Sequence, residues 1–548
     1  MSNSNAFLGW AHTHRNPLIV AGLVCICLGI DVVALRSVQD YALTGGFSFL
    51  GLFLIIFIPF TIAVPALWYL IVVRKMRQEL VFLIAATVFG LLLMLVRTPY
   101  TWFDENDHAY LAIYYSDVAL GAEHGVNEDG QLTWTGRAED ANNAALSPGA
   151  FSYHKTSVDD YRLMVEHFFT LEQNPGQTTT LAVDDTGVFY QYIPSALGVT
   201  IAHLLHWGKV PTLYLGKLFS LAFFVLMMYL TIKIAPQRFK TLMALLGLIP
   251  FILSSAGTFS YDTTINVLSF FLIAFVLRLA YESKRVRARD IVLLAIIGTL
   301  LAPLKFVYFP LVFLPLIIPG NKWPRPHFRI FWCLGMLILG LCSIGLFSLH
   351  QTTTTVAGAT ADTSLDSYYP DAYTLKSLFA HPTSALRVLG RSFFEHIGLI
   401  IDTNSGFTFS SRLPTWTSYL VFVLLVLNTG SNGNEGSAGR SSNAGNDSNA
   451  GSRADKALPT MRASTRLITL ALASAIYVLV LLASVSWTTV GATLLMGIQG
   501  RYFIPLLPLL ALAISGLIRP NKDLSYTSLY LFCCLNGMEV FFTFLSVI

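Results

Sequence analysis

Charge is the first thing that this sequence has little of. Only 12% of its 548 residues are Asp, Glu, Lys or Arg, whereas 54% are apolar. Ordinary soluble domains carry about a quarter charged residues, so this chain has about half the usual share. The few charges also collect in short polar segments between long apolar runs. The pattern excludes an ordinary soluble globule and predicts a protein that crosses a membrane many times.

Cysteine is also scarce, and its placement excludes a disulfide framework. All six cysteines fall inside apolar runs: Cys25, Cys27, Cys333, Cys342, Cys533 and Cys534. Free cysteines in such places are small buried or lipid-facing residues. We also find no internal repeat of solenoid period and no duplicated halves.

The apolar runs can be tested by length, because a spanning helix needs about 20 mostly apolar residues. The runs predict an all-α polytopic fold with about 13 transmembrane helices. They are 17–36, 47–73, 80–97, 212–234, 239–255, 262–281, 291–304, 306–319, 328–349, 416–430, 464–486, 502–518 and 525–547. The first run is too long for the apolar core of a cleavable signal, so we interpret it as an anchor.

Basic residues indicate the orientation, because Lys and Arg in short loops favour the cytoplasm. Placing every basic loop inside requires an inside N-terminus, an outside C-terminus and an apolar segment 189–207 that lies in the outer interface without crossing. The net charge of +4 follows from these loops and gives no reason to expect nucleic acid as a partner. We therefore predict a multi-pass protein of the plasma membrane.

Five regions follow from this topology. A first extracytoplasmic loop with an interfacial helix is expected between the N-terminal and central helices. A second loop, with an amphipathic stretch at 384–401, is expected before the C-terminal helices. A Gly/Ser/Asn-rich insert at 429–457 is expected to be a disordered cytoplasmic segment. The regions are 1–97, 98–211, 212–349, 350–415 and 416–548.

The first candidate site opens the first outer loop. If this segment is helical, Asp104 and His108 lie four residues apart and Glu105 and His108 three apart, so they share a face. Such a cluster suits a general base or a set of ligands for a divalent cation. The alternative is that these are solvated acidic residues at a membrane exit.

Two further candidates head apolar segments. Asp262, after Tyr261, is an N-cap or first-turn residue favoured by the helix dipole, or part of a site. Lys305 is the only basic residue between Asp290 and Lys322. It either extends toward water or, as an ionisable residue between two spans, serves a function.

Arg501 is the fourth candidate, followed by Tyr502. It heads an apolar helix at the end where the dipole disfavours a cation. That position indicates an anionic partner, and a guanidinium suits phosphate through paired hydrogen bonds. Arg387 and Arg391, four apart in the stretch 384–401, are expected to anchor that stretch at the lipid surface.

Together the candidates place carboxylates, one Lys and one Arg at the outer face. A carboxylate can deprotonate an acceptor while cations hold an anionic leaving group. Glycosyl transfer from a lipid-linked phosphate sugar has these two needs.

Several short motifs in a fixed order also resemble a bacterial membrane-protein family, domain of unknown function 2142, which looks like a branch of the GT-C glycosyltransferases. Asp104-Glu105-Asn-Asp-His108 is similar to the family's Pro-Asp-Glu-x-x-His, although the proline here is Pro99. Lys217 stands where the family has Arg. The remaining motifs are Tyr192-Ile-Pro, Tyr214-Leu-Gly-Lys217, Ser260-Tyr261-Asp262, Leu304-Lys305-Phe-Val-Tyr308 and Gln499-Gly-Arg501-Tyr502-Phe-Ile-Pro.

The resemblance implies a GT-C-like arrangement that transfers sugar from a polyprenyl-phosphate donor to an envelope polysaccharide, lipid or protein acceptor. Asp104 or Glu105 would be the general base, with His108 positioning it or a metal. Lys305 and Arg501 would neutralise the donor phosphate. Asp262 would position a sugar or a cation, and Tyr261 and Tyr502 complete the substrate-binding set. Metal dependence stays open, with Mg or Mn held by Asp104, Glu105 and His108 if a cation is used.

Two rival functions remain. A transporter or flippase of a lipid-linked sugar would place charges at the bilayer midplane and often has paired halves. A non-enzymatic scaffold of a polysaccharide-assembly complex would carry degenerate site residues. The rim position of the charges argues against the first, and the intact acidic and basic candidates argue against the second.

Overall fold

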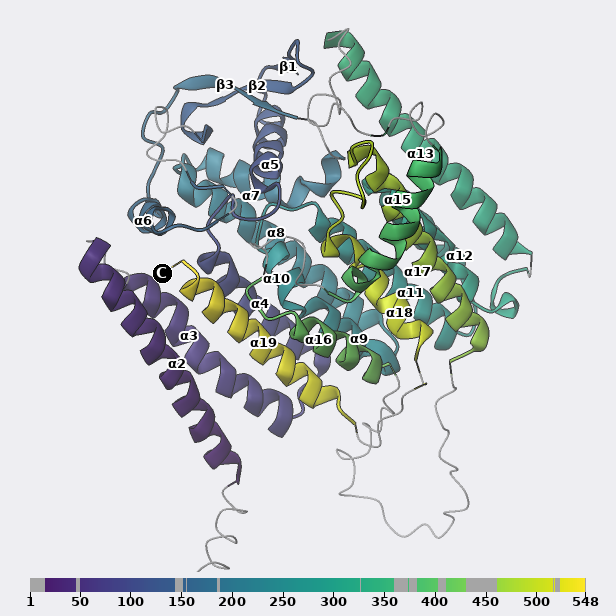
Figure 1. The fold of residues 1–548 in the computed structure, drawn as a ribbon, viewed down its shortest axis with the longest axis horizontal. Helices are drawn as coiled ribbons and strands as arrows, with labels where there is room; N and C mark the ends of the chain where they lie inside the picture. The colour runs from purple at the N-terminus through teal and green to yellow at the C-terminus, as the bar shows by residue number, and fades with distance from the viewer. Residues whose placement is uncertain are drawn as a thin grey trace, which may run out of the picture.

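The structure is a computed structural model of a largely helical protein (Figure 1). It describes residues 15–45, 50–142, 151–153, 155–184, 188–325, 327–358, 373, 382–402, 411–429, 461–515, 517 and 523–547. The predicted insert at 429–457 lies almost entirely outside these residues. So do parts of both predicted loops.

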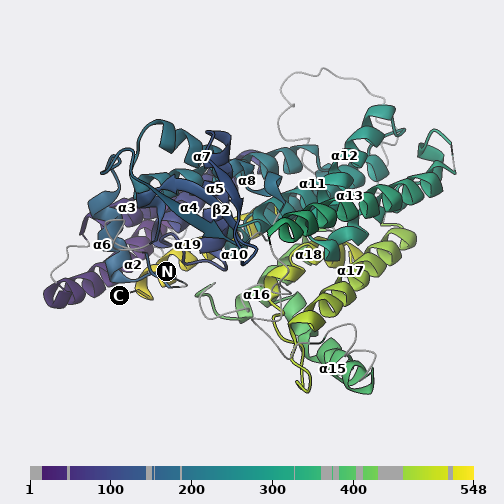
Figure 2. The same cartoon turned by 90° about the horizontal axis from the view of Figure 1, so that it is seen from above.

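Seven helical segments in the described part of the chain are long and apolar enough to cross a membrane. They lie in α2 (Arg15–Gly45), α3 (Leu50–Trp68) with the π-turn η1 (Tyr69–Val73), α4 (Gln78–Val96), α8 (Lys209–Ile234), α11 (Asp262–Tyr281), α17 (Ala463–Ala483) and α19 (Ser525–Leu545). The most buried of these helices is α11, in which 89% of an 18-residue apolar stretch lies inside the protein. In α2 only 11% of the corresponding stretch is buried. Figure 2 shows α2 and α3 at one side of the molecule and α12, α13 and α17 at the other.

The prediction of about 13 spans is therefore not confirmed. One of the remaining predicted runs, 328–349, lies in the 31-residue helix α13 (Phe328–Gly358), which begins with the apolar stretch Phe328–Ser343. The other runs form helices that are short or broken: α9 (Lys240–Gly247) with α10 (Pro250–Ala256), α12 (Ala288–Leu304), η5 (Phe306–Ile317), α16 (Trp416–Leu427) and α18 (Leu506–Ala513). Apolar run length does not reveal where a helix breaks, and the breaks are what shorten these elements.

Prolines explain two of the breaks. α9 and α10 meet at a 66° bend, and Pro250 begins α10. α12 ends one residue after Pro303, and Lys305 is extended, with φ −160°. The 12 residues of η5 then form a 3-10 helix that contains Pro310 and Pro315, which cannot donate to an α-helical ladder. At about 2.0 Å per residue η5 is about 24 Å long, close to the length of the 17-residue α12.

A small sheet corrects the all-α prediction. β1 (His124–Val126), β2 (Leu132–Arg137) and β3 (Thr178–Val183) pair antiparallel in the order β1-β2-β3, with Trp134 opposite Leu181. Alternate residues of β2 are buried, as expected of a strand with one face on a core. The sheet covers α5 (Glu105–Ala119), and we call this end of the helical bundle the sheet end (Figure 1).

Short elements complete the sheet end. Its remaining segments are η2 (Ala138–Asp140), α6 (Val158–His167), η3 (Phe189–Gln191) and α7 (Ile193–Leu204). α7 packs along α8 and exposes Ile193, Leu197 and Leu204. The predicted interfacial segment 189–207 thus contains a 12-residue apolar helix, too short to span a membrane, and its location in the outer interface stays a prediction.

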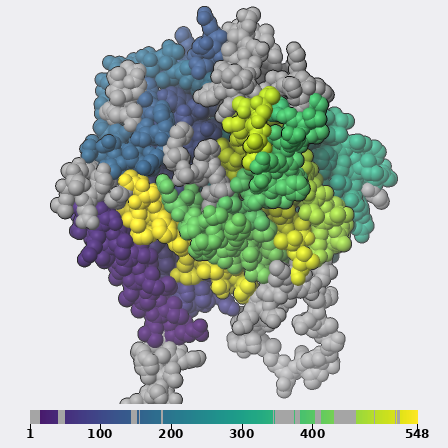
Figure 3. All heavy atoms as spheres, viewed as in Figure 1, coloured from purple at the N-terminus to yellow at the C-terminus, as the bar shows by residue number. Residues whose placement is uncertain are grey.

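The second predicted loop contains one long described helix, α15 (Pro382–Glu395), followed by η7 (His396–Ile400). Both belong to the predicted amphipathic stretch. Residues of α15 and α16 are coloured green in Figure 3, on the face turned to the viewer. Four short turns complete the described elements: η4 (Gln237–Phe239), η6 (Gly320–Lys322), η8 (Ser484–Trp487) and η9 (Gly500–Phe503).

Candidate functional site

Segments that lie far apart in the sequence meet at the sheet end of the bundle. Asp104 directly precedes α5, and Asp262 is the first residue of α11. Lys305 sits at the break between α12 and η5, and Arg501 lies in η9. Each residue stands where a helix begins or ends, so its side chain can reach across the end of the bundle. The structure thus brings four of the predicted site residues together.

Arg501 is at the centre of this group. Its Nη2 lies 3.1 Å from Asp104 Oδ2 and its Nη1 lies 3.4 Å from Asp262 Oδ2. The side chain is only 2% exposed, and its Nε and Nη1 make no hydrogen bond to the described residues. Burial lowers the pKa of Arg501, but the neighbouring Asp262 and further acidic groups outweigh burial and raise it. The site therefore keeps a permanent positive charge with unused donors.

Aromatic rings hold the two cations side by side. The Arg501 guanidinium carbon is 4.7 Å from the ring centre of Phe103 and 5.3 Å from that of Tyr502. Lys305 Nζ is 3.9 Å from the Tyr502 ring centre and donates to the Tyr261 hydroxyl at 3.1 Å. One ring, Tyr502, thus faces both cations. Burial lowers the pKa of Lys305, and the nearby Tyr502 and Asp262 partly oppose that shift.

Asp104 presents the most accessible acidic group of the site. Its side chain is 58% exposed, and its backbone is left-handed, with φ +51°. Asp tolerates this region better than most residues, but the conformation still costs free energy, and such residues often occur at functional sites. The Asp104 carbonyl accepts from His108 N at 3.1 Å, which starts the first turn of α5.

Glu105 points away from Asp104 and into the protein. It is fully buried, and its two carboxylate oxygens accept from the backbone N–H groups of Trp102 at 3.0 Å and Phe259 at 3.2 Å. Burial raises the pKa of Glu105. These contacts join the start of α5 to the loop before α11, so Glu105 stabilises the local fold. Asp104, in contrast, remains accessible to solvent.

His108 contacts Tyr261, the residue whose hydroxyl accepts from Lys305. Its Nδ1 is 3.0 Å from the Tyr192 hydroxyl, and its ring meets that of Tyr261 edge to face at 4.7 Å. Burial lowers the pKa of His108 to about 4, so the ring is neutral at physiological pH. Its Nε2 has no hydrogen-bond partner among the described residues.

The three predicted metal ligands do not gather their donor atoms. The Glu105 oxygens are taken by backbone amides, and Asp104 is paired with Arg501. A bound divalent cation would also lie close to the Arg501 charge. The arrangement is better suited to an anion, which Arg501 and Lys305 would hold beside the exposed carboxylate of Asp104.

Two aromatic residues of the site were not among the predicted site residues, although Tyr308 belongs to one of the motifs. Phe103 stacks on Arg501, and the Tyr308 hydroxyl donates to the Tyr502 carbonyl at 3.0 Å. Each lies within three residues of a predicted site residue in the sequence. An aromatic residue next to a charged candidate was the available signal.

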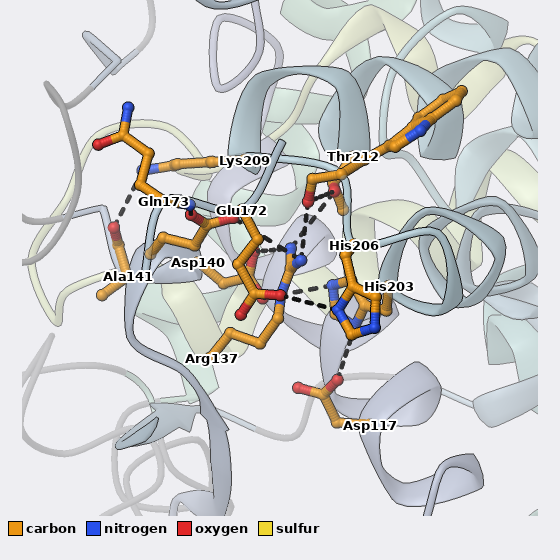
Figure 4. A network of polar contacts seen from close by, with 12 residues as sticks. Asp117, Arg137, Asp140, Ala141, Glu172, Gln173, His203, His206, Lys209 and Thr212 are labelled. Carbon is orange, nitrogen blue, oxygen red and sulfur yellow. Dashed lines mark hydrogen bonds and ion pairs between the residues drawn. The ribbon is translucent and has the colours of Figure 1, made fainter. Parts of the chain in front are cut away.

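A second polar cluster lies under the sheet and was not predicted (Figure 4). The donor atoms of Asp117, Asp140 and His203 lie within 4.8 Å of one another, a spacing that can hold a metal ion. The cluster already contains its own cations, however. His203 Nδ1 is 2.9 Å from Asp117 and its Nε2 is 3.3 Å from Asp140. Arg137 donates to both Asp140 oxygens, at 2.9 and 2.7 Å.

These contacts fix the protonation of the cluster. Burial alone would lower the pKa of His203, but Asp140 and Asp117 outweigh burial and raise it to about 9. The pKa of Asp140 is well below its ordinary value, because Arg137 and His203 outweigh its own burial. A protonated imidazole between two carboxylates joins α5, η2 and α7, so we interpret this cluster as a structural clamp of the sheet end.

The clamp predicts a pH-dependent stability. Because the folded pKa of His203 is raised from 6.5 to about 9, its stabilisation is complete below pH 6.5 and is lost as pH rises toward 9. The difference corresponds to about 3 kcal/mol at most. We expect the thermal unfolding midpoint in detergent to fall over this range, and to fall much less in His203→Gln.

His206→Gln is the matched control. His206 pairs with Glu172 at 3.1 Å, but its side chain is 74% exposed, and exposed pairs contribute little. Its pH profile should follow that of the wild type. Equal slopes in all three proteins would contradict a charged His203 clamp.

Comparison with known proteins gives one match. The family model described as a predicted membrane protein (DUF2142) matches residues 87–510, which include every residue of the candidate site. No curated protein and no solved structure matches the chain.

Proposed function

The chain belongs to the DUF2142 family of predicted membrane proteins, and from this premise we propose that it is a membrane glycosyltransferase. It would move a sugar from a polyprenyl-phosphate-linked donor to a cell-envelope acceptor at the outer face of the membrane, by a GT-C-like reaction. The observation that carries the proposal is the buried Arg501, with unused donors, between the carboxylates of Asp104 and Asp262 and beside Lys305.

The proposed step is a single displacement. An acceptor hydroxyl oxygen bonds to the anomeric carbon while the bond from that carbon to the phosphate oxygen breaks. Asp104 takes the hydroxyl proton, and the polyprenyl phosphate leaves with the electron pair. The configuration at the anomeric carbon inverts. Asp104 is favoured over Glu105 as the base because its side chain is exposed, whereas both Glu105 oxygens are bound to backbone amides.

The leaving phosphate is held by the two cations. Arg501 can donate a pair of hydrogen bonds to phosphate oxygens, and Lys305 adds a point charge. When the phosphate binds Arg501 it competes with Asp104 for the same guanidinium, so donor binding would release the base. The neutral His108 and the carboxylate of Asp262 are then placed to hydrogen-bond the sugar.

Arg501 also bears on the cation question. It occupies the space between Asp104 and Asp262 that a divalent cation would need, and it supplies the positive charge that a metal would supply. We therefore propose that neither Mg nor Mn is required.

The transporter alternative has one observation in its favour. α9 and α10 form a bent pair, and broken helices line substrate sites in many transporters. Here, however, the break between α9 and α10 is not open to a substrate. Asn536 Nδ2 donates to the Leu248 carbonyl at 2.7 Å, and Leu248 and Ile249 are fully buried. The charged site at the sheet end is a better candidate than this apolar break.

The test uses full-length protein in lipid nanodiscs with a panel of polyprenyl-phosphate sugars and an envelope polysaccharide fraction as acceptor. Wild type should release polyprenyl phosphate, with or without EDTA. Arg501→Lys should release it about 10²–10³-fold more slowly, as for loss of a transition-state donor. Arg285→Lys, an exposed arginine outside the site, should match the wild type.

Other outcomes separate the alternatives. Loss of release in EDTA, restored by Mg or Mn, would overturn the metal-free step. Sugar-lipid that crosses a bilayer without release, at the same rate in Arg501→Lys, would favour a transporter. Neither release nor crossing would favour a scaffold.

A further inference from the structure

α15 has three distinct faces. Ala385, Val388 and Ser392 are buried against the protein, at spacings of three and four residues. Leu386 and Phe394 are exposed, at 68% and 74%. α15 packs against α17, and the exposed Leu386 and Phe394 lie on a surface separate from the buried face.

The third face carries positive charge. Arg387 and Arg391 are both exposed and lie four residues apart, so they stand on the same side of the helix. Among the described residues no carboxylate lies within 4.0 Å of either guanidinium. An exposed apolar face next to a basic stripe is typical of a helix that lies in the plane of a membrane surface.

α15 is held rigidly at the edge of the molecule, beyond α17 (Figure 2). The backbone N–H of Leu495 donates to Ser392 Oγ at 2.8 Å, and the Tyr477 hydroxyl of α17 donates to the Phe393 carbonyl at 2.6 Å. η7, which continues α15, packs against η9, the turn that carries Arg501. The basic stripe therefore belongs to a fixed surface that is continuous with the wall of the candidate site.

We propose that α15 binds the phosphate headgroups of anionic phospholipids through Arg387 and Arg391, with Leu386 and Phe394 inserted among the acyl chains. This surface would hold the sheet end of the bundle at the headgroup layer of one leaflet. The partner is a lipid, because only a membrane lipid offers an anionic phosphate and an acyl chain to adjacent faces of one helix. The inference goes beyond the proposed chemistry and does not depend on it.

Hydrogen exchange of the full-length protein in nanodiscs tests this locally. Two nanodisc compositions are compared: phosphatidylcholine alone and a 3:1 mixture of phosphatidylcholine and phosphatidylglycerol. Phosphatidylglycerol should slow exchange of the peptide covering 382–395 by about 25-fold, since two basic residues near an anionic surface each contribute about fivefold. Arg387→Gln/Arg391→Gln should lose this protection, and Arg387→Lys/Arg391→Lys should keep most of it.

The control removes the same charge elsewhere. Arg285→Gln/Arg289→Gln also replaces two exposed arginines four residues apart, and the protection of 382–395 should persist in that variant. Equal exchange in the two compositions, or protection that survives in Arg387→Gln/Arg391→Gln, would overturn the proposal. Equal protection by inorganic phosphate in phosphatidylcholine nanodiscs would show that free phosphate, and not lipid, is the ligand.

Discussion

Asp104→Asn is expected to slow polyprenyl-phosphate release by about 10²–10⁴-fold, the usual contribution of a general base. Asn keeps the size of the side chain and tolerates the left-handed backbone that Asp104 adopts. The side chain is largely exposed, so the substitution should leave the thermal unfolding midpoint nearly unchanged. Single-turnover release and thermal unfolding, measured on the same preparation, separate the loss of chemistry from loss of fold.

Glu105→Gln is the matched comparison, because it makes the same chemical change one residue away. A Gln amide has one acceptor oxygen, whereas both Glu105 oxygens now accept from the backbone N–H groups of Trp102 and Phe259. One buried N–H would lose its partner, which costs about 1–3 kcal/mol. We expect a lower unfolding midpoint and substantial remaining release. If the folded Glu105→Gln protein lost release and Asp104→Asn retained it, Glu105 would be the base.

The different surroundings of Asp104 and Glu105 could not be predicted from their spacing in the sequence. Helical periodicity placed Asp104, Glu105 and His108 on one face, but α5 begins only at Glu105. The positive φ at Asp104 turns its side chain away from the direction that a continuous helix would give. A sequence pattern states which residues share a helix face, but it does not state at which residue the helix begins.

The convergence of Asp262, Lys305 and Arg501 was better predicted than the helices that carry them. Each is an isolated charge at the end of an apolar run. The ends of membrane-spanning runs lie at one or the other surface of the bilayer, so such charges are expected to lie near one another. The break before Lys305 and the 3-10 helix after it depend on Pro303, Pro310 and Pro315 and on packing against neighbouring helices. Run length alone could not predict them.

The individual side-chain pairs that join distant segments could not be predicted. The clamp of Asp117, Asp140 and His203 depends on a sheet whose strands β2 and β3 are about 40 residues apart. Glu539 is a similar case. It is a single acidic residue within the apolar run 525–547, and an ionisable residue in a span is a signal of a specific partner, but periodicity does not identify that partner.

The partner of Glu539 is Arg97, at the end of α4. Nη2 of Arg97 lies 2.5 Å from Glu539 Oε1, and the side chains are 4% and 0% exposed. Ser411 Oγ donates to the second oxygen at 2.9 Å, and Lys217 Nζ donates to the Arg97 carbonyl at 2.6 Å. The ion pair thus joins α4, α19 and the segment before α16.

We expect Glu539→Gln to destabilise the fold by about 3–5 kcal/mol, because it leaves the Arg97 charge buried without its counter-ion. Arg97→Met should destabilise the fold by a similar amount, because it leaves the Glu539 carboxylate buried without its counter-ion. The double variant Arg97→Met/Glu539→Met should be much less destabilised than the sum of its parts, since it buries no unpaired charge. Denaturant unfolding of the four proteins in mixed micelles gives the coupling free energy directly.

The exposed pair Arg162 and Asp159, at 3.3 Å, supplies the control cycle. Its coupling should be below about 1 kcal/mol. Additive losses in the Arg97–Glu539 cycle would mean that water or another group replaces the missing partner, and that the pair does not fix the helix ends. A large coupling would instead mean that the end of α4 is fixed by a contact whose other half lies more than 400 residues away, in α19.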